Sequence, residues 1–140
     1  MTTAPENRLS LSARVAADLM AEGLASLPAT TTFREAVSFF IDHNTSVALV
    51  TADSKPVGVI TLTDLLIHVR ECLATERISS VPISSLMTET IFSVPSSMPV
   101  DEVVQDMLRS KVHHLFVQDH GKIVGVINAC DFVQHLRTGD

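Results

Sequence analysis

Apolar residues recur with helical spacing in some stretches of this chain and form short continuous runs in others. Ala36, Val37, Phe40 and Ile41 share one face of an amphipathic helix. The runs at 47–51 and 56–61 are too short for helices and predict buried strands joined by a turn. In the first half of the chain, the pattern predicts a lead-in helix at 13–20, a strand at 24–27, a helix at 33–43, strands at 47–51 and 56–61, and a helix at 63–74. In the second half, it predicts a lead-in helix at 83–87, a strand at 91–94, a helix at 99–110, strands at 115–118 and 123–128, and a helix at 129–137.

The same polar and apolar order occurs twice. Lys55-Pro-Val-Gly-Val-Ile-Thr-Leu-Thr-Asp64 matches Lys122-Ile-Val-Gly-Val-Ile-Asn-Ala-Cys-Asp131 at an offset of 67 residues (131 − 64). Residues 15–69 slide onto 82–136 without a gap, which aligns Leu19-Met20 with Leu86-Met87. Helical periodicity alone would not also align glycines, prolines, lysines and aspartates, so the chain is an internal duplication.

Each half therefore reads as β-α-β-β-α with a short lead-in helix, an α+β arrangement. A polar, flexible segment is expected at 1–12, the repeats at 13–75 and 83–137, and a linker at 76–82 that is too short to separate independent domains. A unit of about 60 residues is marginal alone. We therefore expect the two repeats to pack together through their sheets with pseudo-twofold symmetry.

Composition narrows the class of function. The net charge of −6 and the pI near 5.4 argue against a nucleic-acid surface and against an anionic membrane face. The apolar runs are too short to span a bilayer, and the N-terminus lacks the pattern of a secretory signal. Cys72 and Cys130 form no Cys-x-x-Cys pair. Both are expected to be free thiols, which favours a cytoplasmic location.

The duplicated Gly-Val-Ile-x-x-x-Asp turns, each after a β-α-β half and a Leu-Met lead-in, resemble a tandem cystathionine-β-synthase (CBS) domain pair, the Bateman module. The resemblance covers residues 15–137. It implies a stand-alone regulatory module without catalytic chemistry, whose clefts between the repeats bind an adenosine-containing ligand such as AMP, ADP or ATP. It also implies a homodimer formed through helices, and a regulated partner protein that the sequence does not identify.

Physical chemistry supports a ligand role for Asp64 and Asp131. An aspartate near a helix N-terminus can accept hydrogen bonds from the two vicinal hydroxyls of a ribose, and each charge-assisted bond contributes about 1.5–3 kcal/mol. A phosphate is repelled by the aspartate but favoured by free amides at the helix N-terminus. Thr61 adds a hydroxyl beside the first turn, and Asn128 adds an amide where the family prefers Thr or Ser.

Other candidate residues follow from the resemblance. His113 and His114 precede a strand at a position that often supplies phosphate contacts in the family, whereas repeat one has Ser46 and Val47 there. The two sites should therefore differ. The resemblance implies crossed sites: the Asp131 site would borrow Leu24, Ala25 and Ser46, and the Asp64 site would borrow Ile91, Phe92 and His113.

Simpler interpretations stay open. Asp64 and Asp131 fit helix caps equally well, since aspartate is favoured there for its own sake. His113 and His114 fit one core and one surface residue, because alternate strand residues face opposite ways. The chain would then be a structural dimerisation or docking module without a nucleotide. An enzyme is not expected, because no Gly-x-Ser-x-Gly, Walker-type or Gly-x-Gly-x-x-Gly motif occurs. No metal spacing is present, and no cofactor is required.

Overall fold

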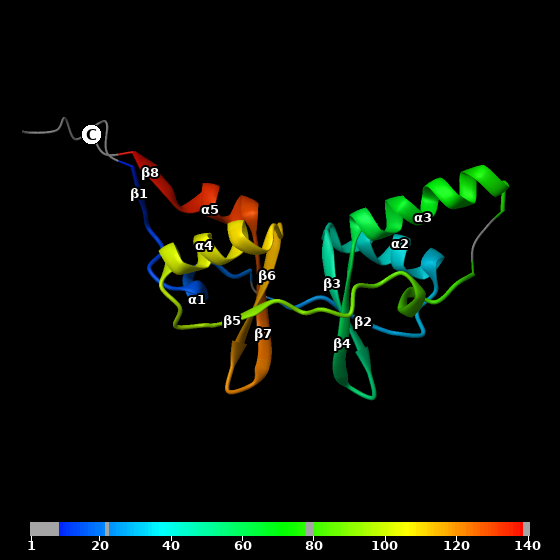
Figure 1. The fold of residues 1–140 in the computed structure, drawn as a ribbon, viewed down its shortest axis with the longest axis horizontal. Helices are drawn as coiled ribbons and strands as arrows, with labels where there is room; N and C mark the ends of the chain where they lie inside the picture. Colours follow the sequence, from blue (N-terminus) through cyan, green and yellow to red (C-terminus); the bar gives the residue numbers. More distant parts are fainter. Residues whose placement is uncertain (1–8, 22, 78–79, 139–140) are drawn as a thin grey trace, which may run out of the picture. The chain divides into compact units, whose positions relative to one another are not determined.

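The computed structural model describes residues 9–21, 23–77 and 80–138, and these form two compact units (Figure 1). We call residues 24–91 the central unit. The terminal unit combines residues up to Gly23 with those from Phe92 onwards. Each unit contains a β-α-β-β-α arrangement of mixed helices and strands, so the predicted fold class is confirmed.

The central unit is built on a three-stranded sheet with the order β2-β3-β4. β2 pairs with β3 in parallel, and β3 pairs with β4 antiparallel. Its elements are β2 (Ser26–Pro28), α2 (Phe33–His43), β3 (Val47–Ala52), β4 (Lys55–Thr61), α3 (Leu62–Thr75) and a 3₁₀ helix (Ile83–Ser85). The terminal unit has the equivalent sheet, with the order β5-β6-β7, and the same strand directions. Its elements are β1 (Leu9–Leu11), α1 (Ala16–Leu19), β5 (Ser93–Pro95), α4 (Val100–Ser110), β6 (His114–Asp119), β7 (Lys122–Asn128), α5 (Ala129–His135) and β8 (Leu136–Thr138).

The duplication extends to an irregularity in the strands. The β3–β4 register shifts between Val50 and Thr51, and the β6–β7 register shifts between Val117 and Gln118. These positions differ by the repeat offset. Such bulges bend and twist a hairpin, so the same local distortion is built into both units.

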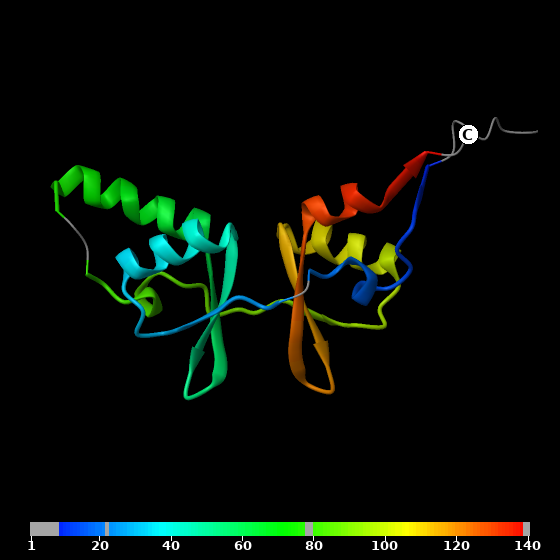
Figure 2. The ribbon, with the colours of Figure 1, turned by 180° about the vertical axis from the view of Figure 1, so that it is seen from behind.

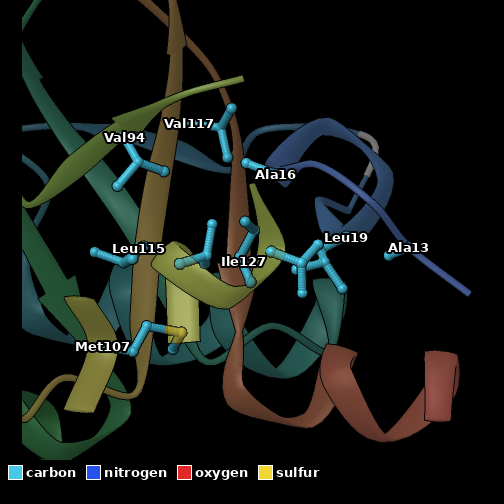
Figure 3. Packing of buried hydrophobic residues seen from close by; sticks show 10 residues of the cluster. Ala13, Ala16, Leu19, Val94, Met107, Leu115, Val117 and Ile127 are labelled. Carbon is cyan, nitrogen blue, oxygen red and sulfur yellow. The ribbon is translucent and has the colours of Figure 1, made fainter. Parts of the chain in front are cut away.

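Each unit has its own apolar core. In the central unit Val50, Ile60 and Ile83 are completely buried. In the terminal unit the core joins side chains from α1, β5, α4, β6 and β7, as Figure 3 shows for Ala16, Val94, Met107, Leu115 and Ile127. Continuous burial along β3 and β6 explains why these strands read as unbroken apolar runs.

The lead-in segments are exchanged between the repeats. Ile83 and the neighbouring Met87 pack in the central unit, with the first repeat's strands and helices. Thr88 there forms two backbone hydrogen bonds with Val59 of β4, at 2.8 and 2.9 Å. The lead-in of the first repeat instead packs in the terminal unit, where Ala21 donates to Val126 of β7 at 3.0 Å. In Figure 2, α1 accordingly lies with the elements of the second repeat.

Glycines admit these exchanged segments. A Cβ atom at Gly58 of β4 would lie 2.7 Å from both the sulfur of Met87 and the carbonyl oxygen of Thr88. A Cβ atom at Gly125 of β7 would lie 2.7 Å from the sulfur of Met20. The two glycines are therefore packing positions, required because backbone or side chain lies directly against the strand.

The largest differences from the sequence-based prediction lie near the chain ends. Residues 1–8 of the segment predicted to be flexible are outside the described residues, but Leu9–Leu11 form β1. The last helix was predicted to reach residue 137, yet it ends at His135 and continues as β8, which pairs antiparallel with β1. The Ser12 N–H also donates to the His135 carbonyl at 2.8 Å. Backbone pairing with a distant strand thus replaces the last helical turn.

The lead-in helices are shorter than predicted. The first is the single turn Ala16–Leu19, and the second is the 3₁₀ turn Ile83–Ser85. Their neighbours Ala21 and Thr88 instead use their backbone amides to bond β7 and β4. The strands that these segments contact therefore determine their conformation. Helical periodicity along the sequence carries no information about such contacts.

The predicted capping box of α2 is confirmed. The Thr32 amide and hydroxyl each donate to Glu35 Oε1 at 2.9 Å, and the Glu35 amide donates to Thr32 Oγ1 at 3.2 Å. These bonds from Thr32 lower the pKa of Glu35 below its ordinary value of 4.5. Hydrogen bonds from the Arg14 and Val15 amides likewise lower the pKa of Asp18. Asn44, predicted to stop α2, adopts a left-handed conformation at its C-terminal end.

Within the described ranges, no helix combines the length and the apolarity that crossing a bilayer requires. Cys72 is half-buried and Cys130 is exposed, and the structure places neither in a disulfide among the described residues.

Candidate functional site

Asp64 occupies the third position of α3, directly after β4. Its Oδ2 atom accepts hydrogen bonds from the Thr61 amide and the Thr61 hydroxyl, both at 2.9 Å. In return, the Asp64 amide donates to Thr61 Oγ1 at 3.2 Å. The side chain is half-buried, and no described residue donates a hydrogen bond to Oδ1. Asp64 is thus a helix cap through one oxygen, and its other oxygen can accept from a ligand.

Asp131 repeats this geometry at the start of α5. Its Oδ2 atom accepts from the Asn128 amide at 2.7 Å, and the side chain is again half-buried. The Asn128 side chain makes no cap hydrogen bond. Thr61 engages its hydroxyl in the cap, whereas the amide group of Asn128 is not used in this way. The interpretation of both aspartates as caps is therefore confirmed for one oxygen of each carboxylate.

The first amide of each helix is already engaged, which corrects the expectation of free amides there. Leu62 N–H of α3 donates to the Ser46 carbonyl at 3.0 Å, and Ala129 N–H of α5 donates to the His113 carbonyl at 2.8 Å. These equivalent bonds tie each helix start to the residue before the neighbouring strand. A phosphate would have to use amides further into the turn, or side chains.

The two predicted histidines differ in environment. His113 is exposed, and His114, the first residue of β6, is half-buried with its ring edge-on to Phe116 at 6.1 Å between centroids. His113 lies before the strand and holds Ala129 through its carbonyl. The terminal unit contains four of the predicted site residues, which lie on β6, β7 and α5 or directly beside them: His113, His114, Asn128 and Asp131.

The residues expected to hold the adenine base lie just before the first strand of each sheet and are partly exposed. Ala25 is half-buried, and its carbonyl accepts from Leu49 at 2.9 Å. Phe92, its repeat equivalent, is 41% exposed, and its carbonyl accepts from Phe116 at 2.9 Å. Leu24 and Ile91 are half-buried and precede them in the chain. That each site borrows these residues from the other repeat stays a prediction.

His68 and His135 recur one turn after each aspartate, where the sequence favours surface or interface positions, and the structure gives each histidine a specific contact. His68 is buried, lies edge-on to Phe33 with centroids 4.8 Å apart, and shares a 3.1 Å hydrogen bond with Glu71. His135 shares a 2.9 Å hydrogen bond with Ser12. His68 thus contacts α2 through Phe33, and His135 contacts the residue that follows β1. No metal-binding group of His, Cys, Asp and Glu occurs in the part of the chain that the structure describes.

Comparison with known proteins decides the family. The model of the CBS domain matches residues 15–71 and again residues 83–138. The chain belongs to the CBS domain family. It is a tandem CBS-domain chain, because the two matches coincide with the two halves of the duplication. CBS-domain pairs are generally regulatory modules rather than catalysts.

An uncharacterised protein of Methanopyrus kandleri is 30% identical over 90 residues, which are 64% of this CBS-domain chain and 45% of that protein. The match thus spans less than half of that relative's length.

Solved structures show the same fold. A CBS-domain protein from Agrobacterium tumefaciens is 21% identical with a TM-score of 0.77, over 87% of this chain and 92% of that one. A CBS-domain protein from Pyrobaculum aerophilum, complexed with AMP, is 23% identical with a TM-score of 0.70, over 84% and 88% of the two chains. The CBS-domain pair of protein MJ0100, in complex with 5′-methylthioadenosine and S-adenosyl-L-methionine, is 21% identical with a TM-score of 0.71, over 89% and 95%.

Proposed function

We propose that this CBS-domain chain is a non-catalytic regulatory module that binds an adenosine-containing ligand, AMP, ADP or ATP, at Asp64 and Asp131. The observation that carries the proposal is the equivalent placement of the two carboxylates. Each uses Oδ2 for its helix cap, and each Oδ1 is without a donor among the described residues. The cap fixes the side chain, and no described residue competes for the other oxygen. Such a preorganised acceptor suits hydroxyl groups of a ribose.

The two sites are expected to differ toward phosphate. Around Asp64, the Thr61 hydroxyl is already committed to the carboxylate, and Ser46 carries no charge. Around Asp131, the Asn128 side chain makes no cap hydrogen bond, and His113 is exposed. The terminal unit therefore has more groups able to contact a charged phosphate, and the central unit fewer.

Three ligands of solved relatives share one chemical group. AMP, 5′-methylthioadenosine and S-adenosyl-L-methionine each contain adenosine, while their other groups differ in charge. This supports the adenosine moiety, rather than a particular phosphate count, as what this chain recognises. A homodimer, a regulated partner protein and a cytoplasmic location complete the proposal.

The alternative function is a structural dimerisation or docking module without a physiological nucleotide. The specific observation in its favour is that both aspartates do act as helix caps. Capping alone accounts for an aspartate at these positions. The two functions differ in whether replacing the carboxylates changes ligand binding or only stability.

Thermal unfolding with AMP, ADP and ATP separates them. A ligand at one hundred times its Kd stabilises the folded chain by about 2.7 kcal/mol. For a chain of this size, that raises the Tm by roughly 5–10 °C. We expect such a rise with at least one nucleotide in the wild-type chain. The double variant Asp64→Asn with Asp131→Asn should lose it, because asparagine can still accept the cap hydrogen bond but carries no charge.

Glu35→Gln provides the matched control, since it makes the same kind of change in the capping box of α2. This variant should melt earlier than wild type yet keep the full ligand-induced rise. No rise with any of the three nucleotides would favour the structural module. A rise that persists in the double aspartate variant would place the ligand elsewhere, and conversion of the nucleotide to product would make the chain an enzyme.

A further inference from the structure

A groove between α4 and α5 of the terminal unit is apolar except for two basic residues. It has a volume of about 630 Å³, and small-molecule sites in proteins span roughly 300–1,000 Å³. Among the described residues that line it, only Lys111 and His113 are ionisable. The apolar part of the wall includes Met107, Leu108 and Phe132. The groove therefore suits a ligand that is mostly hydrocarbon but carries an acidic group.

The repeat-equivalent groove between α2 and α3 provides a matched comparison. It has a volume of about 550 Å³, and none of the described residues in its wall is ionisable. The repeat offset places Asn44 there where the terminal groove has Lys111. Ser46, the equivalent of His113, does not contribute to its wall. The basic residues thus distinguish the terminal groove from its equivalent and are not required by the shared fold.

The two grooves also differ in their apolar walls. Ala129 at the start of α5 replaces Leu62 at the start of α3, so a much smaller side chain borders the terminal groove. Leu11 of β1 contributes to the terminal groove, and β1 is held in place by its pairing with β8. The described part of the central unit has no equivalent strand. The terminal groove is therefore larger although an additional strand contributes to its wall.

The charges beside this groove favour an anion. Lys111 ends α4, and both Lys111 and His113 are exposed. Neither takes part in an ion pair among the described residues. A ligand could bury its hydrocarbon chain in the groove and keep its charge in water beside Lys111, as amphipathic side chains do at protein surfaces. A nucleotide is a poor occupant, because its polar groups would lose water against an apolar wall without gaining partners.

We propose that the α4–α5 groove binds a medium-chain fatty acid, with the hydrocarbon chain against Met107, Leu108 and Phe132 and the carboxylate beside Lys111. This site goes beyond the proposed nucleotide function, because it uses the space between the helices and not the carboxylate of Asp131. His113 is also a predicted phosphate contact, so the experiments leave it unchanged.

Isothermal titration calorimetry of the full-length chain with decanoate tests the proposal. We expect saturable binding of one decanoate per chain, and octanoate should bind more weakly by up to about fourfold for each methylene group removed. Lys111→Asn introduces the residue of the central groove, and Asn44 shows that asparagine adopts the same left-handed conformation. This variant should weaken decanoate binding by about two- to fivefold and leave decanol binding unchanged.

Filling the groove is expected to have a larger effect. Ala129→Leu introduces the side chain that stands at the equivalent position of α3, and should weaken decanoate binding by more than about tenfold. Leu62→Ala is the matched control, since it makes the reverse change in the central groove. It should change decanoate binding by less than about twofold. Thermal unfolding shows whether each variant is folded, and the exposed Lys111→Asn decides the matter if Ala129→Leu is not.

The proposal is overturned if decanoate shows no saturable binding to the wild-type chain. It is also overturned if folded Ala129→Leu and Lys111→Asn both bind decanoate as tightly as wild type does, because the fatty acid would then lie elsewhere. A change in sedimentation of Ala129→Leu, without decanoate binding by wild type, would assign the groove to a protein partner instead. The nucleotide-induced rise in Tm is measured separately, so failure of this site and failure of the nucleotide site are distinct results.

Discussion

A fragment of residues 24–91 is expected to fold on its own, whereas a fragment of residues 13–75, which follows the sequence repeat, is not. The first fragment contains the whole central unit. The second lacks Ile83, which is completely buried among the core residues of that unit. It also lacks Thr88, which forms two hydrogen bonds with Val59 of β4.

The size of the effect follows from how little stability a small unit has. A domain of this length has a net stability of about 3–5 kcal/mol. Losing the burial of Ile83 alone removes roughly 1.5–3 kcal/mol, and the edge of β4 loses its backbone partners as well. The repeat-based fragment also retains Ala16 and Leu19, whose partners lie in the terminal unit, as exposed apolar residues.

Circular dichroism and urea unfolding of the two fragments measure this difference. The 24–91 fragment should show a cooperative transition, and the 13–75 fragment should show none. The exchanged lead-in segments would not determine the folding unit if the 13–75 fragment unfolded cooperatively. The same would follow if the 24–91 fragment showed no cooperative transition.

Replacing the two repeated glycines by alanine is expected to destabilise the chain unequally. At Gly58, a Cβ atom would meet the backbone carbonyl of Thr88 as well as the Met87 sulfur, both at 2.7 Å. At Gly125, the nearest atoms all belong to the flexible side chain of Met20, with its sulfur at 2.7 Å. A methionine can move aside, whereas the backbone at Thr88 is held by its pairing with Val59.

Overpacking of this kind costs about 1–3 kcal/mol. We expect Gly58→Ala to lie at the upper end of that range and Gly125→Ala near or below the lower end. Chemical denaturation of the full chain measures the loss of stability in both variants. Alanine also loses less backbone entropy than glycine on folding, but this gain is equal at the two sites and so does not affect the comparison. If Gly125→Ala proved the more damaging of the two, close approach to Thr88 would not be the reason that glycine stands at position 58.

The element order was predictable because each half repeats the same apolar periods. The bounds of α2 were predicted without error, since Thr32 and Glu35 form the expected cap and Asn44 the expected stop. The bounds of β6 and β7 were close, because burial of β6 leaves a continuous apolar run. The exchange of lead-in segments and the pairing of β1 with β8 were not predicted. Both depend on contacts between residues far apart in the chain, which local periodicity does not report.

A signal for the exchange was nevertheless present. The pairs Leu19-Met20 and Leu86-Met87 recur at the same offset as Gly58 and Gly125. Repeated glycines in strands indicate close approach by another segment, and the repeated methionines are the side chains that approach. What the sequence does not contain is which glycine meets which methionine.

The sequence predicted the positions of the two carboxylates of the candidate site, but only part of their surroundings. The offset placed Asp64 and Asp131 at the start of their helices, where the structure has them. The use of the Ser46 and His113 carbonyls to bind the first helical amides was not foreseen. Those bonds come from backbone geometry, so no side chain at either position indicates them.

Native mass spectrometry of the full-length chain, equilibrated with AMP, tests the central claim most directly. We expect a bound adenosine nucleotide, up to two per chain, that is lost in the double variant Asp64→Asn with Asp131→Asn and retained in Glu35→Gln. The claim would be contradicted if AMP, ADP and ATP all failed to bind the wild-type chain, or if the double aspartate variant bound them as tightly as wild type does.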